Sequence, residues 1–98
     1  MDVTVTDVPE RDRYEARAGA ELLAVAQYER AEGLVVFTHT VVQPAHEGEG
    51  IGSTLVRAAL DDVRRQGLRA VPRCPFVAAW VRRHREGYGD LVAADPQG

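Results

Sequence analysis

Three glycines at alternate positions, placed between an apolar run and a helical pattern, constrain the fold of this chain more than any other feature. The run Leu34–Val42 is rich in β-branched residues, which is typical of a strand, and Pro44 ends it because proline has no N–H for a further ladder bond. Gly48, Gly50 and Gly52 follow. Glycine tolerates positive φ angles and lets a ligand approach the backbone closely. We therefore predict a strand that ends in a loop shaped for a ligand.

The pattern after this loop predicts an amphipathic helix over residues 51–66. Its apolar positions recur with a helical period at Ile51, Leu55, Val56, Ala59, Leu60 and Val63. Gly67 is suited to end it, and Arg64 and Arg65 complement the dipole of its last turn. The first-turn N–H groups of a helix have no intrahelical partner, so the loop and helix start predict an anion site with phosphate as the natural ligand. The alternative is an ordinary glycine-rich turn before a packed helix.

The glycine spacing narrows the kind of phosphate ligand. Gly48-Glu49-Gly50-Ile51-Gly52 does not match the dinucleotide-binding pattern G-x-G-x-x-G, and a P-loop needs a lysine, which this chain lacks entirely. The segment instead resembles the acyl-CoA signature of the GCN5-related N-acetyltransferases (the GNAT family), V-x-P-x-x-R/Q-G-x-G-I/x-G/A. The residues that match in register are Val42, Pro44, Gly48, Gly50, Ile51 and Gly52. Glu47 stands where the family usually has Arg or Gln, and with Glu49 it should weaken the local attraction for phosphate.

The resemblance continues through Phe37–Thr40, Gly50–Leu60 and Val71–Ala79, which are similar to small single-domain GNAT-like proteins of the YjdJ type. It implies that the chain binds acetyl-CoA or coenzyme A. Backbone groups of Val41 and Val42 would pair with the pantetheine amides. The loop and helix start would hold the pyrophosphate, through Glu47, Gly48, Glu49, Gly50, Ile51, Gly52 and Ser53. Such proteins lack most of the acceptor-binding helices of full-length acetyltransferases, so the resemblance supports the cofactor better than the reaction.

Two features of the last third of the chain bear on this resemblance. After His84 the chain reads Arg85-Glu86-Gly87-Tyr88, where the resemblance leads us to expect His-Pro-Glu-Tyr. Arg82 and Arg83 are candidates for contact with the 3′-phosphate of coenzyme A, and a solvated helix face is the alternative.

Cys74 and His39 are the candidate catalytic residues. Cys74 stands at the end of an expected strand and at a helix N-terminus, where a thiol pKa can be lowered; a buried apolar cysteine is the alternative. His39 could act as a general base, or it could be a half-buried packed histidine on the strand face of Val35, Phe37 and Val41. If both side chains faced one cleft, they would form a nucleophile and its base.

We predict a compact α/β (α+β) domain over residues 1–98 with the GNAT-like fold, a mostly antiparallel twisted sheet with one parallel strand pair and two helices. Residues 1–8 should form a short first strand or a frayed end. The other expected strands are 13–17, 21–29, a central 34–42, a parallel 68–72 reached by a right-handed crossover, and an edge strand 90–93. Residues 21–29 are also rich in helix formers, so a helix is the alternative prediction for this segment. The second helix should cover residues 75–84, with Phe76 and Trp80 in the core under it; a platform for adenine is the alternative.

Composition limits the remaining classes of function. A formal charge of −3 and the lack of a long basic run give no reason to expect nucleic acid, and one cysteine allows neither an internal disulfide nor a cysteine-based metal cluster. No segment has the length of a membrane span, so we expect a cytoplasmic protein, monomeric or weakly dimeric. The predicted function is transfer of acetyl from acetyl-CoA to a small-molecule or peptide amine, directly or through a cysteine. The alternative is a non-catalytic CoA-binding sensor or interaction module.

Overall fold

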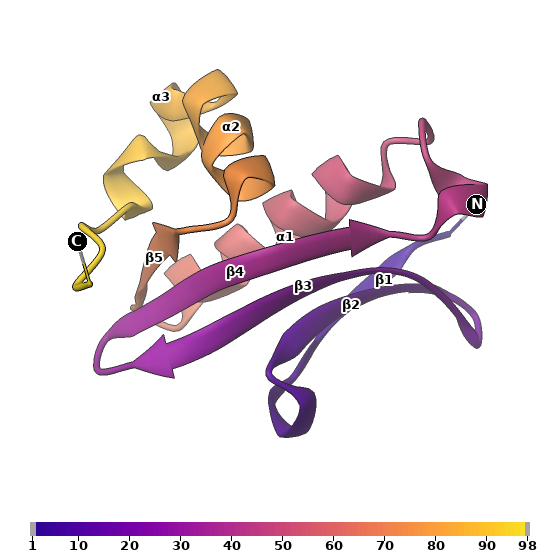
Figure 1. Ribbon diagram of the computed structural model, residues 1–98, viewed down its shortest axis with the longest axis horizontal. Coiled ribbons are helices and arrows are strands. Elements are labelled where there is room, and N and C mark those ends of the chain that lie inside the picture. Colours follow the sequence, from indigo (N-terminus) through magenta and orange to yellow (C-terminus); the bar gives the residue numbers. More distant parts are fainter. Residues whose placement is uncertain (1, 98) are drawn as a thin grey trace.

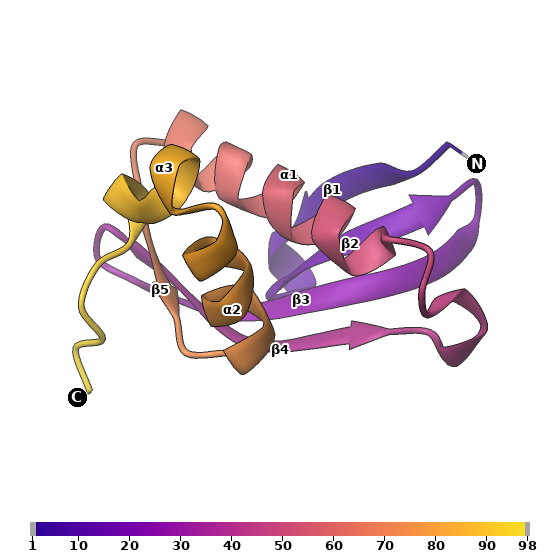
Figure 2. The ribbon, with the colours of Figure 1, turned by 90° about the horizontal axis from the view of Figure 1, so that it is seen from above.

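The computed structural model describes residues 2–97 and contains one five-stranded sheet in the order β1-β2-β3-β4-β5. Helices α1 and α2 lie side by side over one face of this sheet (Figures 1 and 2). The elements are β1 Thr4–Val8, β2 Arg13–Ala18, β3 Glu21–Ala31, β4 Leu34–Val42, α1 Ile51–Arg65, β5 Arg69–Pro72, α2 Pro75–Arg83 and α3 Arg85–Tyr88. Short 3-10 turns cover Pro9–Arg11, Pro44–His46 and Gly89–Leu91. The predicted α+β class with one parallel pair is confirmed.

Strands β1 to β4 form an antiparallel meander, and β5 returns parallel to β4 with Leu34 opposite Arg69 and Phe37 opposite Pro72. Residues 21–29 are strand rather than helix because both edges of β3 pair with neighbours, and this tertiary pairing overrides their helix propensity. The central strand of the sheet is therefore β3, and the prediction that 34–42 is central was wrong. The apolar run in β4 is explained by burial of the first half of the strand, where Val35, Val36 and Phe37 are all buried.

The main core lies between the sheet and the two long helices. Tyr14, Tyr28 and Phe37 form an aromatic group on the helix-facing side, with ring centroids 5.5 to 6.4 Å apart. The Tyr14 hydroxyl donates a 2.7 Å hydrogen bond to Asp62 of α1. This bond fixes the position of α1 over β2.

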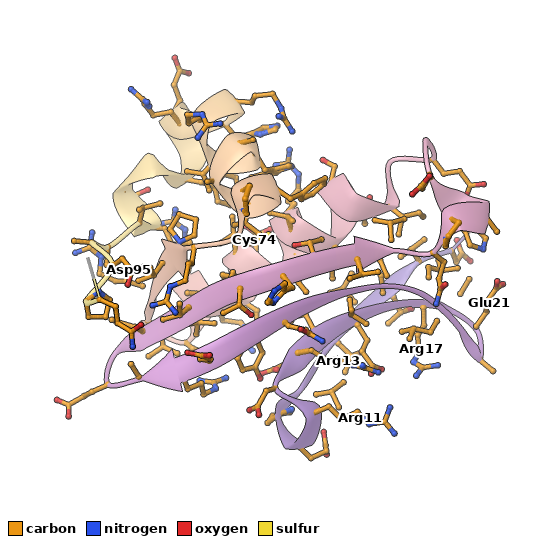
Figure 3. All side chains as sticks on the ribbon, viewed as in Figure 1. Arg11, Arg13, Arg17, Glu21, Cys74 and Asp95 are labelled. Atoms are coloured by element: carbon orange, nitrogen blue, oxygen red, sulfur yellow. The ribbon has the colours of Figure 1, made fainter. Side chains whose placement is uncertain are left out.

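The opposite face of the sheet carries a buried carboxylate. The Glu15 side chain accepts hydrogen bonds from Arg13 at 2.8 Å and Arg17 at 3.0 Å, and Arg11 lies 3.8 Å away. Figure 3 shows the three arginines below the sheet, on the side away from Cys74. Burial opposes ionisation of Glu15, but the two arginine hydrogen bonds outweigh it and hold its pKa below the usual value. The buried charge is therefore fully paired.

The chain after α2 differs from the expectation. Residues 90–93 do not form an edge strand: Gly89–Leu91 is a 3-10 turn, and Val92 makes only an isolated parallel bridge to Ala70. The Arg69 guanidinium donates to the carbonyl oxygens of Asp90 and Val92, at 3.3 and 2.6 Å, so a side chain supplies bonds that a strand ladder would have made. The structure thus has three helices rather than two. None of them, within residues 2–97, is long and apolar enough to span a bilayer.

Candidate functional site

Strand β4 loses its parallel neighbour half-way along its length. Strand β5 pairs only with Leu34–Phe37. The Cys74 N–H then donates a 2.8 Å hydrogen bond to the Phe37 carbonyl, and the chain turns away into α2 at Pro75. Beyond Phe37, β4 pairs with β3 alone, so its other side is an open edge that leads toward the glycine loop (Figure 1).

The pairing with β3 fixes which backbone groups point to this open edge. The Gln43 N–H donates to the Leu23 carbonyl at 2.8 Å, and backbone groups alternate in direction along an antiparallel strand. The backbone groups of Thr40 and Val42 therefore point to the open edge, and those of Val41 point to β3. Of the two valines expected to pair with pantetheine, Val42 presents its backbone at the open edge, whereas Val41, which is 55% exposed, does not.

A β-bulge at Thr38 decides which side chains of β4 face the helices. The register passes from Tyr28 opposite Phe37 to Gln27 opposite His39, which leaves Thr38 as the extra residue. As a result Thr40 lies beside Cys74, with Oγ1 and Sγ 3.4 Å apart. His39 is exposed on the opposite face, so the expectation of a half-buried His39 beside Val35 and Phe37 was wrong. The expected face of His39 assumed that side chains alternate strictly along the strand, and a bulge interrupts this alternation.

The two candidate catalytic residues are consequently not brought together. Cys74 is 4% exposed and packs in the helix-side core, at the N-cap of α2. His39 lines a shallow hollow on the open face of the sheet with Gln27 and Arg73. The sheet separates the thiol from the imidazole.

The glycine loop leaves the start of α1 uncapped. Gly48 and Gly50 have φ angles of 83° and 78°, values that favour glycine, and a Cβ at either position would meet nothing within 4 Å. Gly50 is the N-cap and offers no side-chain acceptor, and the first backbone bond of α1 runs from the Thr54 N–H to the Gly50 carbonyl. The N–H groups of residues 51–53 are thus free of intrahelical acceptors, as an anion site requires.

A cavity of about 440 Å³ lies at this loop. It is lined by Val42, His46, Glu47, Gly48, Gly50, Ile51, Gly52, Ser53 and Phe76. The residues expected to bind the cofactor therefore border one cavity, with the exceptions of Val41 and Glu49. The cavity begins where the open edge of β4 ends.

Helix α2 closes the cavity from one side. A Cβ at Gly52 would lie 2.8 Å from Cζ of Phe76, so a glycine is what lets this ring pack against the first turn of α1. Phe76 is 40% exposed, and the prediction that it belongs to the core was wrong because it covers the glycine loop instead. Trp80 is fully buried, as predicted, and its indole N–H donates a 2.8 Å bond to the Ser53 hydroxyl.

His46 is a residue of the loop that the sequence did not single out. Its Nδ1 lies 3.0 Å from a Glu49 oxygen and its Nε2 lies 3.0 Å from a Glu21 oxygen, at the start of β3. Hydrogen bonds to Glu21 and then to Glu49 raise the pKa of His46 above its ordinary value. This pairing offsets part of the acidity that was expected to weaken phosphate binding. The three-residue spacing of His46 and Glu49 could have indicated the contact between them. The contact with Glu21 could not be predicted, because Glu21 is distant from His46 in the sequence.

These features together suit an elongated ligand. The open edge of β4 offers backbone hydrogen bonds to an amide-containing chain, and the cavity at the start of α1 offers N–H groups to a phosphate. The two sites are contiguous, so one molecule with amides at one end and phosphates further along could use both.

Comparison with known proteins agrees with this geometry. The solved structures that resemble the chain include a GCN5-like protein from Staphylococcus aureus, with a TM-score of 0.66 and 19% identity over 94% of this chain and 89% of that one. The ribosomal-protein-S18-alanine N-acetyltransferase of Escherichia coli has a TM-score of 0.59 and 17% identity, over 76% of this chain. The ribosomal-protein-alanine N-acetyltransferase of Brucella melitensis has a TM-score of 0.51 and 19% identity, over 85% of this chain and 62% of that one.

The chain spans 50% of the length of the E. coli enzyme, and these identities establish a shared fold only. A comparison with curated protein sequences found no significant match. The family model described as GCN5-related N-acetyl-transferase matches residues 13–91, which is most of the chain. The chain therefore belongs to the GCN5-related N-acetyltransferase family.

Proposed function

We propose that this protein binds acetyl-CoA along the open edge of β4 and at the start of α1, and transfers the acetyl group to a primary amine. The observation that carries the proposal is the continuity of the two sites. Strand β4 loses its β5 neighbour after Phe37, and its open edge leads into a cavity at an uncapped helix start. Membership of the acetyltransferase family supports the same ligand.

Each part of the site has a separate role in this proposal. The backbone groups of Thr40 and Val42 bind the amides of the pantetheine arm. The N–H groups of residues 51–53 bind the pyrophosphate, and protonated His46 adds positive charge to the same cavity. Phe76 excludes water from one side of the cavity.

Acetyl-CoA supplies a thioester, and transfer forms an N–C bond to the acceptor amine as the C–S bond breaks and the CoA sulfur leaves. The amine must first lose a proton. His39 is exposed on the open face of the sheet, so it is our candidate proton acceptor for an amine that approaches from that face. We propose direct transfer because Cys74 is buried on the other face, without His39 beside it.

The test compares two glycines with the same backbone strain. Gly50→Val and Gly33→Val both place a β-branched residue at a positive φ, 78° and 73°, but only Gly50 borders the cavity. We expect calorimetric titration to show acetyl-CoA binding to the wild type and to Gly33→Val, and its loss in Gly50→Val. Equal affinities of the two variants would contradict the proposal, as would a wild-type protein that binds neither acetyl-CoA nor CoA.

A second candidate function is a CoA-binding module without turnover. The separation of Cys74 from His39 favours it, because these two residues then do not act as a nucleophile and its base. It is distinguished by an acceptor screen: such a module binds acetyl-CoA but releases no CoA thiol with any amine.

A further inference from the structure

The open edge of β4 is closed at the end that lies away from the glycine loop. The Cys74 N–H donates to the Phe37 carbonyl at 2.8 Å, and Pro75 then begins α2. Figure 3 shows Cys74 between β4 and the start of α2. Its Sγ lies 3.4 Å from Oγ1 of Thr40. The side chains of Thr40 and Cys74 therefore meet across the end of the open edge, and we call this pair the end wall.

The end wall is held firmly in place. Cys74 is 4% exposed and packs in the same core cluster as Phe37 and Val77. Its carbonyl accepts a backbone hydrogen bond from the Ala78 N–H of α2, at 3.0 Å. Close-packed side chains give way only at a cost in free energy, so the wall does not move aside freely for a larger group.

The distance from the proposed pantetheine contacts to the end wall limits what a ligand can carry at its tip. From the nitrogen of an amide bound at Thr40, five bonds lead through the sulfur to the methyl of an acetyl group, which is the reach of two extended residues, about 7 Å. Strand β4 needs about 10 Å to run from Thr40 back to Phe37, and the bulge at Thr38 shortens this path. A methyl group has a radius of its own, so an acetyl group fills the available length.

We propose that the end wall restricts the acyl group on the donor to acetyl, so that Thr40 and Cys74 determine the acyl-chain specificity of the site. This inference rests on the proposed function, since it assumes that the pantetheine arm lies along the open edge of β4. A propionyl or butyryl group would have to displace the packed side chains of the wall. Cys74 then contributes its volume to the site, and not a nucleophile or a base.

The test is the affinity for acetyl-CoA, propionyl-CoA and butyryl-CoA, measured by calorimetry at one salt concentration with free coenzyme A as the reference. The wild type should bind propionyl-CoA about tenfold more weakly than acetyl-CoA, and butyryl-CoA more weakly still, because each added methylene meets packed side chains. Cys74→Ala removes the sulfur from the wall and should bring the affinity for propionyl-CoA to within about threefold of that for acetyl-CoA. Thr40→Ala, which removes the other side of the wall, should shift this ratio in the same direction.

Two control variants separate the volume of the end wall from other effects. Cys74→Ser keeps a side chain of similar size, so it should keep the wild-type ratio of affinities. Val63→Ala removes volume from the same core near the far end of α1, and it should also keep that ratio.

Two results would overturn the end wall and leave the proposed function intact: equal wild-type affinity for the three thioesters, or an unchanged ratio in both Cys74→Ala and Thr40→Ala. A wild-type protein that binds neither acetyl-CoA nor coenzyme A would overturn the proposed function together with this inference. Thermal unfolding followed by circular dichroism establishes that each variant is folded.

Discussion

His46 links the glycine loop to the first residue of β3 through Glu21. Hydrogen bonds to Glu21 and Glu49 raise the pKa of His46 in the folded protein. Its ion pairs with these two residues therefore stabilise the loop fully below the pKa of an unfolded histidine, about 6.5, and this stabilisation is lost as the pH rises through the pKa of the folded state. We therefore expect acetyl-CoA affinity to fall as the pH rises across this range, since the loop loses both its tether and a positive charge.

NMR titration of the histidine ring signals measures this directly. The pKa of His46 should lie above its ordinary value and move down toward it in Glu21→Gln. Glu49, the second partner of His46, is unchanged in this variant, so the comparison isolates the contact with Glu21. A His46 pKa that does not respond to Glu21→Gln would show that the ion pair has no role in solution.

Cys74 distinguishes direct from covalent transfer. Because its thiol is buried and His39 lies on the other face, we expect no stable acetyl adduct on the protein after incubation with acetyl-CoA. Cys74→Ala should keep its acetyl-CoA affinity within about twofold of wild type, which is about 0.4 kcal/mol. Intact-protein mass spectrometry gives the answer: a mass increase of one acetyl group that disappears in Cys74→Ala would establish the covalent route instead.

At the scale of elements, the hydrogen bond between Tyr14 of β2 and Asp62 of α1 holds the helix over the sheet. Tyr14→Phe removes the hydroxyl and should lower the free energy of unfolding by about 1.5 to 3 kcal/mol, as for other hydrogen bonds to a charged group. Urea titration of Tyr14→Phe, Asp62→Ala and the double variant measures the coupling. If the double variant loses the sum of the two single losses, the bond contributes nothing.

The elements themselves were largely predictable from sequence. Strand β4, the glycine loop and α1 follow from β-branched residues, glycine spacing and a helical apolar period. The end of α1 is as predicted: Gly67 has a φ of 73°, and its N–H bonds to the Arg64 carbonyl. The parallel placement of β5 follows from the handedness of the crossover.

What the sequence could not supply depends on contacts between distant segments. The β-bulge at Thr38 exchanges the faces of His39 and Thr40, and no local signal marks it. The pairing of His46 with Glu21 joins residues that are far apart in the chain. Phe76 packs on the glycine loop and not in the core, because Gly52 has no side chain that would collide with its ring. This contact depends on how α1 and α2 pack against each other, which the sequence does not show.

At the scale of the whole molecule, the chain shares the fold of proteins of different lengths. It spans 89% of the S. aureus protein but half of the E. coli enzyme. The cofactor site that we propose uses only β4, the glycine loop, α1 and α2. One residue outside these elements, Glu21 of β3, also bears on the proposed site through its contact with His46 of the loop.

The most direct measurement of the central claim is a titration of isotopically labelled protein with acetyl-CoA, followed by the backbone amide signals. The site predicts that the largest shifts occur at Thr40, Val42, Gly48, Gly50 and the first turn of α1, with little change on the open face around Gln27. Shifts centred on that open face, or no shifts at any amide, would contradict the account.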